Sequence, residues 1–110
     1  MNKKKLEKRK RNKEDKIWAE TIKKIYQSCI ICKKRERLNA HHIIPKEIKK
    51  FRHLLINGVS LCPKHHKWSL ELSAHRNPFA FYLKLQEICP LKFDKLKEFW
   101  KDYNHESSID

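Results

Sequence analysis

The sequence predicts a small, mostly helical α+β domain in which a two-stranded hairpin is joined to helices by one structural metal site. Apolar residues recur at helical spacing near both ends of the chain, whereas the middle breaks this period and contains two short apolar runs. Two pairs of metal-ligand residues, Cys29-x-x-Cys32 and Cys62-x-x-His65, border those runs. With 110 residues and a single glycine, the chain suits one domain rich in helices.

The clearest helical stripe lies in residues 14–27, with apolar side chains at Trp18, Ile22 and Ile25. We interpret Trp18 as packing surface, because aromatic residues within such a stripe usually lie in the core. The residues before this helix are almost all basic or polar and are expected to be disordered, either gripping phosphates or only solubilising the chain. The predicted division is an arm, one domain and a polar tail: residues 1–13, 14–103 (core 28–75) and 104–110.

The middle of the chain predicts the hairpin. Residues 38–44 and 59–61 form the two apolar runs, and Pro45 ends the first. Asn57-Gly58 precedes the second run and supplies the residue types of a tight turn. Proline fits the first turn of a helix and ends a preceding one. The three proline-bounded helices are expected over residues 63–72, 78–88 and 91–103.

The chain is strongly basic. Lysine and arginine number 27 against 13 acidic residues, and the formal net charge is +14, which attracts polyanions such as nucleic acid. No apolar run approaches the roughly 18 residues of a membrane span, and the N-terminus lacks the apolar core of a signal peptide. We therefore expect a soluble cytoplasmic protein (in the host cytoplasm if viral) without a membrane partner. The basic residues expected to contact nucleic acid are Lys3, Lys4, Lys5, Lys8, Arg9, Lys10, Arg11, Lys46, Lys49, Lys50, Arg52, Lys64 and Lys67.

The paired ligands indicate one structural zinc ion. A two-residue gap lets both side chains of a pair meet one tetrahedral ion, and two such pairs complete a closed site. The predicted ligands are Cys29, Cys32, Cys62 and His65. Two alternatives stay open: the cysteines are buried core thiols with His65 at the surface, or Cys89 replaces His65. We favour His65, because Cys89 stands alone at a predicted helix end.

Four of the seven histidines form two adjacent pairs, His41-His42 and His65-His66. Imidazole suits both metal ligation and proton transfer near neutral pH. Together with Asn57 and the cysteine pairs, these histidines make the segment 29–67 resemble the HNH endonuclease family. That family has a ββα-metal (His-Me finger) core, a two-stranded hairpin plus a helix, with an interleaved zinc knuckle.

The resemblance implies a metal-dependent hydrolase that cuts phosphodiester bonds of single- or double-stranded DNA. It implies that His41 and His66 hold a catalytic divalent cation. It also implies that His42 is the general base and that Asn57 braces the loop which orients this base, although Asn57 could be a turn residue only. Mg²⁺ or Mn²⁺ is the expected cation, and Zn²⁺ or Ni²⁺ also suits histidine ligands. Whether the protein is a monomer or a homodimer stays open.

Two features depart from the family pattern or from ideal geometry. Some relatives place a further histidine four residues after His66, where this chain has Leu70. His75 is the alternative third ligand or substrate contact, although a polar residue near a helix end often has no such role. On an ideal strand His41 and His42 point to opposite faces, so both can flank one phosphate only where the strand twists, bulges or ends.

The main alternative function is a non-catalytic, zinc-stabilised nucleic-acid-binding module. A weaker third alternative is an interaction protein that uses the aromatic face of its last helix. A binding module needs the cysteines and the basic side chains, but it gains nothing from His42 beside His41. We therefore favour the nuclease.

Overall fold

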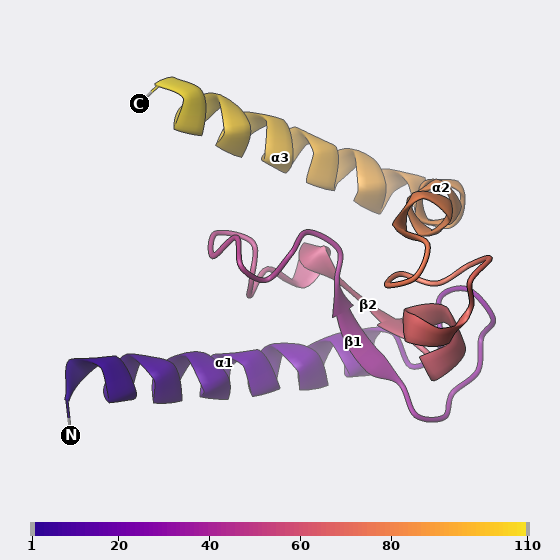
Figure 1. The fold of residues 1–110 in the computed structure, drawn as a ribbon, viewed down its shortest axis with the longest axis horizontal. Coiled ribbons are helices and arrows are strands. Elements are labelled where there is room, and N and C mark those ends of the chain that lie inside the picture. The colour runs from indigo at the N-terminus through magenta and orange to yellow at the C-terminus, as the bar shows by residue number, and fades with distance from the viewer. Residues whose placement is uncertain (1, 110) are drawn as a thin grey trace.

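The structure is a computed structural model that describes residues 2–109 (Figure 1). The helices are α1 (Lys3–Ile25), α2 (Pro78–Ile88) and α3 (Pro90–Ile109). The strands are β1 (Asn39–His42) and β2 (Gly58–Leu61), accompanied by a 3₁₀ turn, η1 (Leu55–Asn57), and a single π-helical turn, η2 (Lys64–Trp68). The fold is thus a mostly helical α+β arrangement with a two-stranded antiparallel hairpin, as predicted.

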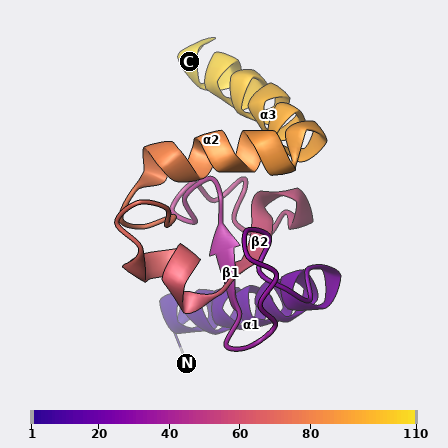
Figure 2. The ribbon, with the colours of Figure 1, turned by 90° about the vertical axis from the view of Figure 1, so that its right-hand side faces the viewer.

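The hairpin lies between two helical layers. α1 packs on one side of the strands, and α2 with α3 lies on the other (Figures 1 and 2). The main core is on the second side, where Val59 and Leu61 of β2 belong to one buried cluster with Phe81 and Leu85 of α2. This core adjoins β1 and η2, the two elements that carry the paired histidines.

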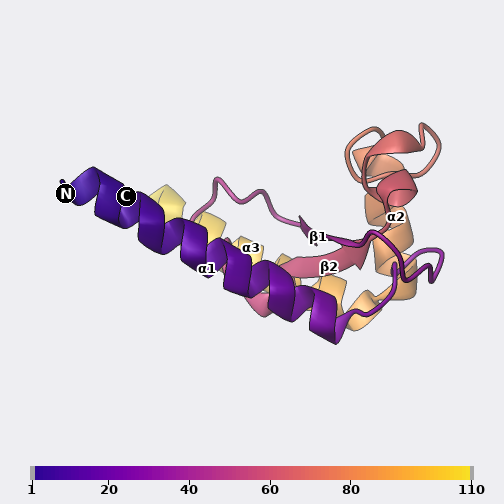
Figure 3. The same cartoon turned by 90° about the horizontal axis from the view of Figure 1, so that it is seen from below.

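α1 is longer than predicted. It begins at Lys3, so the prediction of a disordered arm is wrong for residues 3–13, and residue 1 lies outside the described part. The Asn2 side chain caps the helix by accepting a hydrogen bond from the Lys5 N–H at 2.9 Å, and lysine and arginine are good helix formers. Figure 3 shows the N-terminal half of α1 running past the hairpin. The radius of gyration of 15.1 Å exceeds the roughly 13 Å of a compact chain of this length, as projecting helices require.

Gly58 does not form the predicted turn. Its φ of −134° is that of extended backbone, and η1 makes the connection instead. A Cβ at Gly58 would lie 2.6 Å from side-chain carbons of both Trp18 and Ile22. The glycine is therefore required because it lets α1 approach the backbone of β2 closely.

The C-terminal helices also differ in their bounds. The predicted helix over residues 63–72 is only the turn η2, whereas α2 matches its predicted range. The Asn77 side chain caps α2 by accepting from the Ala80 N–H at 3.1 Å. α3 continues to Ile109, so the residues predicted as a polar tail are helical up to there, and residue 110 lies outside the described part. Within residues 2–109, no helix has the length and apolarity needed to cross a bilayer.

Candidate metal centres

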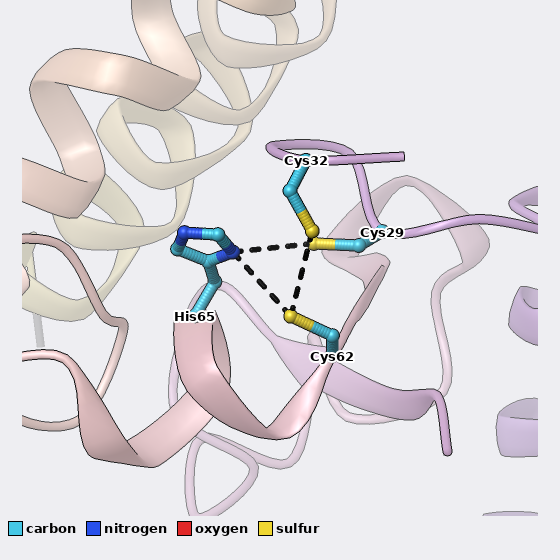
Figure 4. A group of neighbouring side chains, drawn as sticks. All are labelled: Cys29, Cys32, Cys62 and His65. Atoms are coloured by element: carbon cyan, nitrogen blue, oxygen red, sulfur yellow. Dashed lines mark hydrogen bonds between the residues drawn. The ribbon is translucent and has the colours of Figure 1, made fainter. Parts of the chain in front are cut away.

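Four side chains from distant parts of the chain converge on one point beside the core. Cys29 and Cys32 lie in the loop after α1, Cys62 directly follows β2, and His65 lies on η2 (Figure 4). Their ligand atoms all lie within 4.8 Å of one another. Cys89, the alternative ligand, caps the end of α2 and is not part of this group. We call the four residues the Cys₃His cluster.

The dimensions of the Cys₃His cluster fit zinc. The Cys29 and Cys62 sulfurs lie 3.8 and 3.4 Å from Nδ1 of His65, and the Cys32 and Cys62 sulfurs are 3.6 Å apart. A tetrahedral zinc ion with bonds of about 2.3 Å to sulfur and about 2.0 Å to nitrogen separates its ligands by roughly 3.5–3.8 Å. These three separations therefore match those of one tetrahedral zinc ion held by the four residues, with His65 using Nδ1.

The electrostatics of this cluster favour the ligand forms of two residues. Burial opposes ionisation of Cys29, but backbone hydrogen bonds from Cys32 and Cys62 outweigh it and lower the pKa of the thiol. Burial also lowers the pKa of His65, and the neighbouring Lys64 and Lys34 add to this effect. A thiolate and a neutral imidazole are the forms that bind metal.

A second group contains only histidines. The ligand nitrogens of His41 on β1, His66 on η2 and His75 lie within 4.8 Å of one another, and Nε2 of His66 is 3.0 Å from Nε2 of His75. The loop after η2 folds back to bring His75 there, because the His75 N–H donates to the His66 carbonyl at 3.0 Å. We call these three residues the His₃ cluster. The structure thus brings both predicted ligands together with the alternative third one.

Two rings of the His₃ cluster, those of His41 and His66, resist protonation. The pKa of His41 is lowered to about 3, mainly by burial and further by the nearby His66 and His75. The pKa of His66 is lowered to about 4 for the same two kinds of reason, burial first and then His75 and Lys67. Crowded imidazoles that stay neutral at physiological pH have their lone pairs available to a cation.

His42 lies on the opposite side of β1 from His41, against α1. Its ring stacks on Trp18 with centroids 3.9 Å apart and planes at 8°. Nε2 of His42 donates to the Arg52 carbonyl at 2.9 Å, which leaves Nδ1 as the basic nitrogen. Burial lowers the pKa of this ring as well. β1 ends at His42, and both histidines therefore line one hollow despite the alternation of the strand.

This hollow, which we call the His hollow, has a volume of about 430 Å³. Besides His41, His42 and the rest of the His₃ cluster, it is lined by Lys46, Lys67 and Tyr82, among others. The Tyr82 hydroxyl donates to the Ile43 carbonyl at 2.9 Å and so ties α2 to the end of β1. The hollow is thus lined by four imidazoles, by the cationic side chains of Lys46 and Lys67, and by the carboxylate of Glu47.

α1 fixes the loop that orients His42. The Arg52 guanidinium donates from Nε and Nη2 to the Asp15 carboxylate at 2.8 and 2.7 Å. This bidentate pair holds the pKa of Asp15 well below its usual range. The Trp18 indole N–H donates to the Leu54 carbonyl at 2.9 Å. Arg52 therefore holds the loop through its side chain and His42 through its carbonyl, so we assign it to positioning and not to phosphate binding.

Asn57 is fully buried and braces the same loop. Its side-chain oxygen accepts from the Ile44 N–H at 2.6 Å, and its amide donates to the carbonyls of Ile44 and Phe51 at 2.9 and 3.1 Å. These bonds fit the predicted bracing role and exclude contact with a substrate. Asn57 is therefore a positioning residue rather than a catalytic one.

The predicted phosphate-contacting residues other than Arg52 are exposed, and one of them, Lys50, forms a close ion pair. Those on α1, from Lys3 to Arg11, are all exposed, as are Lys46, Lys49, Lys64 and Lys67. Lys50 is exposed as well but pairs with Glu106 at 3.0 Å. Among the side chains described, up to residue 106, no carboxylate pairs with any of these residues except Lys50 and, weakly, Lys10, which lies 4.0 Å from Glu14.

Sequence reasoning missed Asp15 and Trp18 as partners of the site. Trp18 was assigned to packing, which is correct at 4% exposure, but the surface on which it packs is His42 itself. The available signal is the acidic pair Glu14-Asp15, which stands in a very basic segment one turn before Trp18.

The chain was compared with protein-family models, curated proteins and solved structures, and none of the three comparisons gave a match.

Proposed function

We propose that the protein is a metal-dependent endonuclease of the HNH type, which hydrolyses phosphodiester bonds of DNA. One observation carries the proposal: three imidazoles converge within 4.8 Å beside a fourth whose Nε2 is already engaged. This arrangement supplies a cation site and an oriented base around one hollow. The hairpin followed by η2, with the Cys₃His cluster between them, is consistent with a ββα-metal core in which the helix is reduced to one turn.

The residues of the His₃ cluster would hold the cation. His41, His66 and His75 offer nitrogen ligands only, which favour Mn²⁺, Ni²⁺ or Zn²⁺ over the oxygen-preferring Mg²⁺. When bound, a cation there supplies charge neutralisation for the scissile phosphate. Lys46 and Lys67 line the same hollow and would bind the neighbouring phosphate oxygens.

His42 would act as the general base. Its Nε2 is fixed as a donor to the Arg52 carbonyl, so Nδ1 can accept a proton from the attacking water. The stack on Trp18 and the Asp15–Arg52 pair restrict the ring to one orientation. Burial keeps the ring neutral near pH 7, which is the form that a base requires.

Cleavage of plasmid DNA tests the proposal. The parent chain should nick the plasmid when Mn²⁺ or Ni²⁺ is added, and His42→Ala should slow the reaction by roughly 10²- to 10⁴-fold, the usual contribution of a general base. His105→Ala is the matched control, because His105 does not line the His hollow. Equal rates for His42→Ala and the parent would remove His42 from the mechanism.

The second candidate function is the binding module, and the exposed basic face of α1 favours it. The same assay separates the two functions. A module would bind DNA and leave it intact with every metal tested, whereas a nuclease would require the cation.

A further inference from the structure

A second hollow lies on the other side of η2, next to the Cys₃His cluster. It has a volume of about 360 Å³ and is lined by Trp68, by three cationic side chains and by Glu36, with Cys62 at its inner end. The cationic residues are Lys34, Arg37 and Lys64. We call it the Trp68 hollow. None of its residues has a role in the chemistry proposed above.

Trp68 is far more exposed than a packing residue. Its side chain is 68% exposed, against 4% for Trp18, and a tryptophan left in water is an unfavourable use of a large apolar surface. Its position is nevertheless fixed by the backbone. The Ser69 N–H closes η2 by donating to Lys64 at 2.9 Å, and the Arg76 guanidinium donates to the Trp68 carbonyl at 3.2 Å. An exposed aromatic side chain on a well-held backbone is suited to stacking.

The charge of the Trp68 hollow favours an anionic occupant. Within residues 2–109, no carboxylate forms a salt bridge with Lys34, Arg37 or Lys64. A zinc ion with three thiolates carries one negative charge, and Glu36 adds a second, so the cations still outnumber the anions. An aromatic face surrounded by unpaired cations is the arrangement that proteins use to bind single-stranded nucleic acid.

Both hollows border the same turn. His66 and Lys67 of η2 line the His hollow, whereas Lys64 and Trp68 line the Trp68 hollow. A strand with its phosphate at the His₃ cluster can therefore cross η2 and reach Trp68 within a few nucleotides.

We propose that the Trp68 hollow binds an unpaired base of a nucleic-acid strand, which stacks on Trp68 while the adjoining phosphates contact Lys34, Arg37 and Lys64. The position of this base relative to the cut rests on the proposed function, but the binding itself does not. A base within a closed duplex has no free face, so the substrate class is single-stranded or locally unpaired nucleic acid.

The test is a binding measurement on the full chain carrying His42→Ala, loaded with zinc and without other divalent cations. Fluorescence anisotropy compares a labelled oligo(dT) with a duplex of equal length, with an oligo(rU), and with an abasic strand of equal charge. We expect Trp68→Ala to weaken oligo(dT) binding by about 5- to 150-fold and to leave duplex binding nearly unchanged. The abasic strand should bind the parent as weakly as oligo(dT) binds Trp68→Ala. The oligo(rU) arm shows whether the site also accepts RNA.

Two variants act as controls. Trp68→Phe keeps an aromatic face and should restore most of the affinity, and Phe79→Ala removes another exposed aromatic side chain, 74% exposed, outside the hollow and should change nothing. Zinc content and circular dichroism establish that each variant is folded. If Trp68→Ala does not fold, the comparison of oligo(dT) with the abasic strand on the parent decides alone.

Equal affinity of the parent for oligo(dT) and the abasic strand would overturn the inference, as would unchanged binding by a folded Trp68→Ala. Neither result depends on cleavage. Trp68-dependent binding of oligo(dT), together with an unsubstituted chain that never nicks DNA, would disprove the nuclease and keep the binding site. A parent that nicks DNA while ignoring the loss of Trp68 would do the reverse.

Discussion

The two ligand clusters share a turn of the chain and differ in almost everything else. The Cys₃His cluster has four ligands, three of which are buried, and three separations between its ligand atoms match those of a tetrahedral zinc site. The His₃ cluster has three ligands, is only partly buried, and opens into a hollow of about 430 Å³. Structural zinc sites are closed, whereas catalytic sites keep a position open for water or substrate. The comparison therefore favours the Cys₃His cluster as the site that supports the fold and the His₃ cluster as the site of the proposed chemistry.

Removal of the first cluster's metal should give the largest effect. Structural zinc contributes on the order of 10 kcal/mol to the folding of small domains. Cys29→Ser, or a strong chelator, should therefore abolish tertiary structure, as monitored by near-ultraviolet circular dichroism. Cys89→Ser is the matched control, because Cys89 lies outside the cluster. A chain that keeps its fold and its near-ultraviolet signal without zinc would contradict the structural role.

Loss of one ligand of the His₃ cluster should leave the fold intact and weaken only the binding of the second cation. We expect His66→Ala and His75→Ala to bind one zinc ion as the parent does, while their affinity for added Mn²⁺ or Ni²⁺ falls by about 100-fold or more. Isothermal titration calorimetry of the zinc-loaded protein measures both quantities. If His75→Ala binds the second cation as tightly as the parent, His75 is not a ligand and its proximity to His66 is only packing.

The His₃ cluster should make the stability of the folded protein depend on pH. The pKa values of about 3 for His41 and about 4 for His66 lie below the ordinary 6.5, so the folded state binds fewer protons than the unfolded state. The stability that these neutral rings contribute is fully present above pH 6.5 and is lost as the pH falls towards 4. Each ring contributes a slope of at most about 1.4 kcal/mol per pH unit.

Urea unfolding of the zinc-loaded protein between pH 7 and 5.5 measures this slope. His41→Asn should flatten it. Zinc content, followed in parallel, keeps the Cys₃His cluster out of the comparison. An identical slope in His41→Asn and the parent would show that His41 is accessible to protons in the folded protein.

The smallest effect concerns neither cluster. Substitution of Lys3, Lys4 and Lys5 by glutamine should leave both metal sites intact and reduce the salt dependence of duplex binding. The log–log slope should fall by about 0.9 for each phosphate that the variant no longer neutralises. The same substitutions at Lys95, Lys97 and Lys101 of α3 provide a control with an equal change in charge. An unchanged slope would make the first turns of α1 a solubilising segment.

Local patterns predicted one cluster better than the other. The spacing of Cys29, Cys32, Cys62 and His65 sufficed for the Cys₃His cluster, because a two-residue gap restricts the geometry strongly. The spacing of the histidines does not by itself predict a metal site. The resemblance to the HNH family indicated His41, His42 and His66. The roles of these residues in catalysis stay predictions.

What could not be predicted depends on long-range contacts. His75 joins His66 through backbone pairing of a loop without regular structure. Arg52 was taken as a phosphate contact because a basic loop usually faces solvent, but its pairing with Asp15 links positions far apart in the sequence. The pair Asn57-Gly58 predicts a turn. The actual requirement for glycine is the close approach of α1, which the residues next to Gly58 in the sequence do not indicate.

His65 and His66 are consecutive residues of η2, and each serves a different cluster. A single peptide bond therefore links the two clusters. Zinc bound to His65 would order η2 and with it the backbone of His66, so occupation of the first site would favour cation binding at the second.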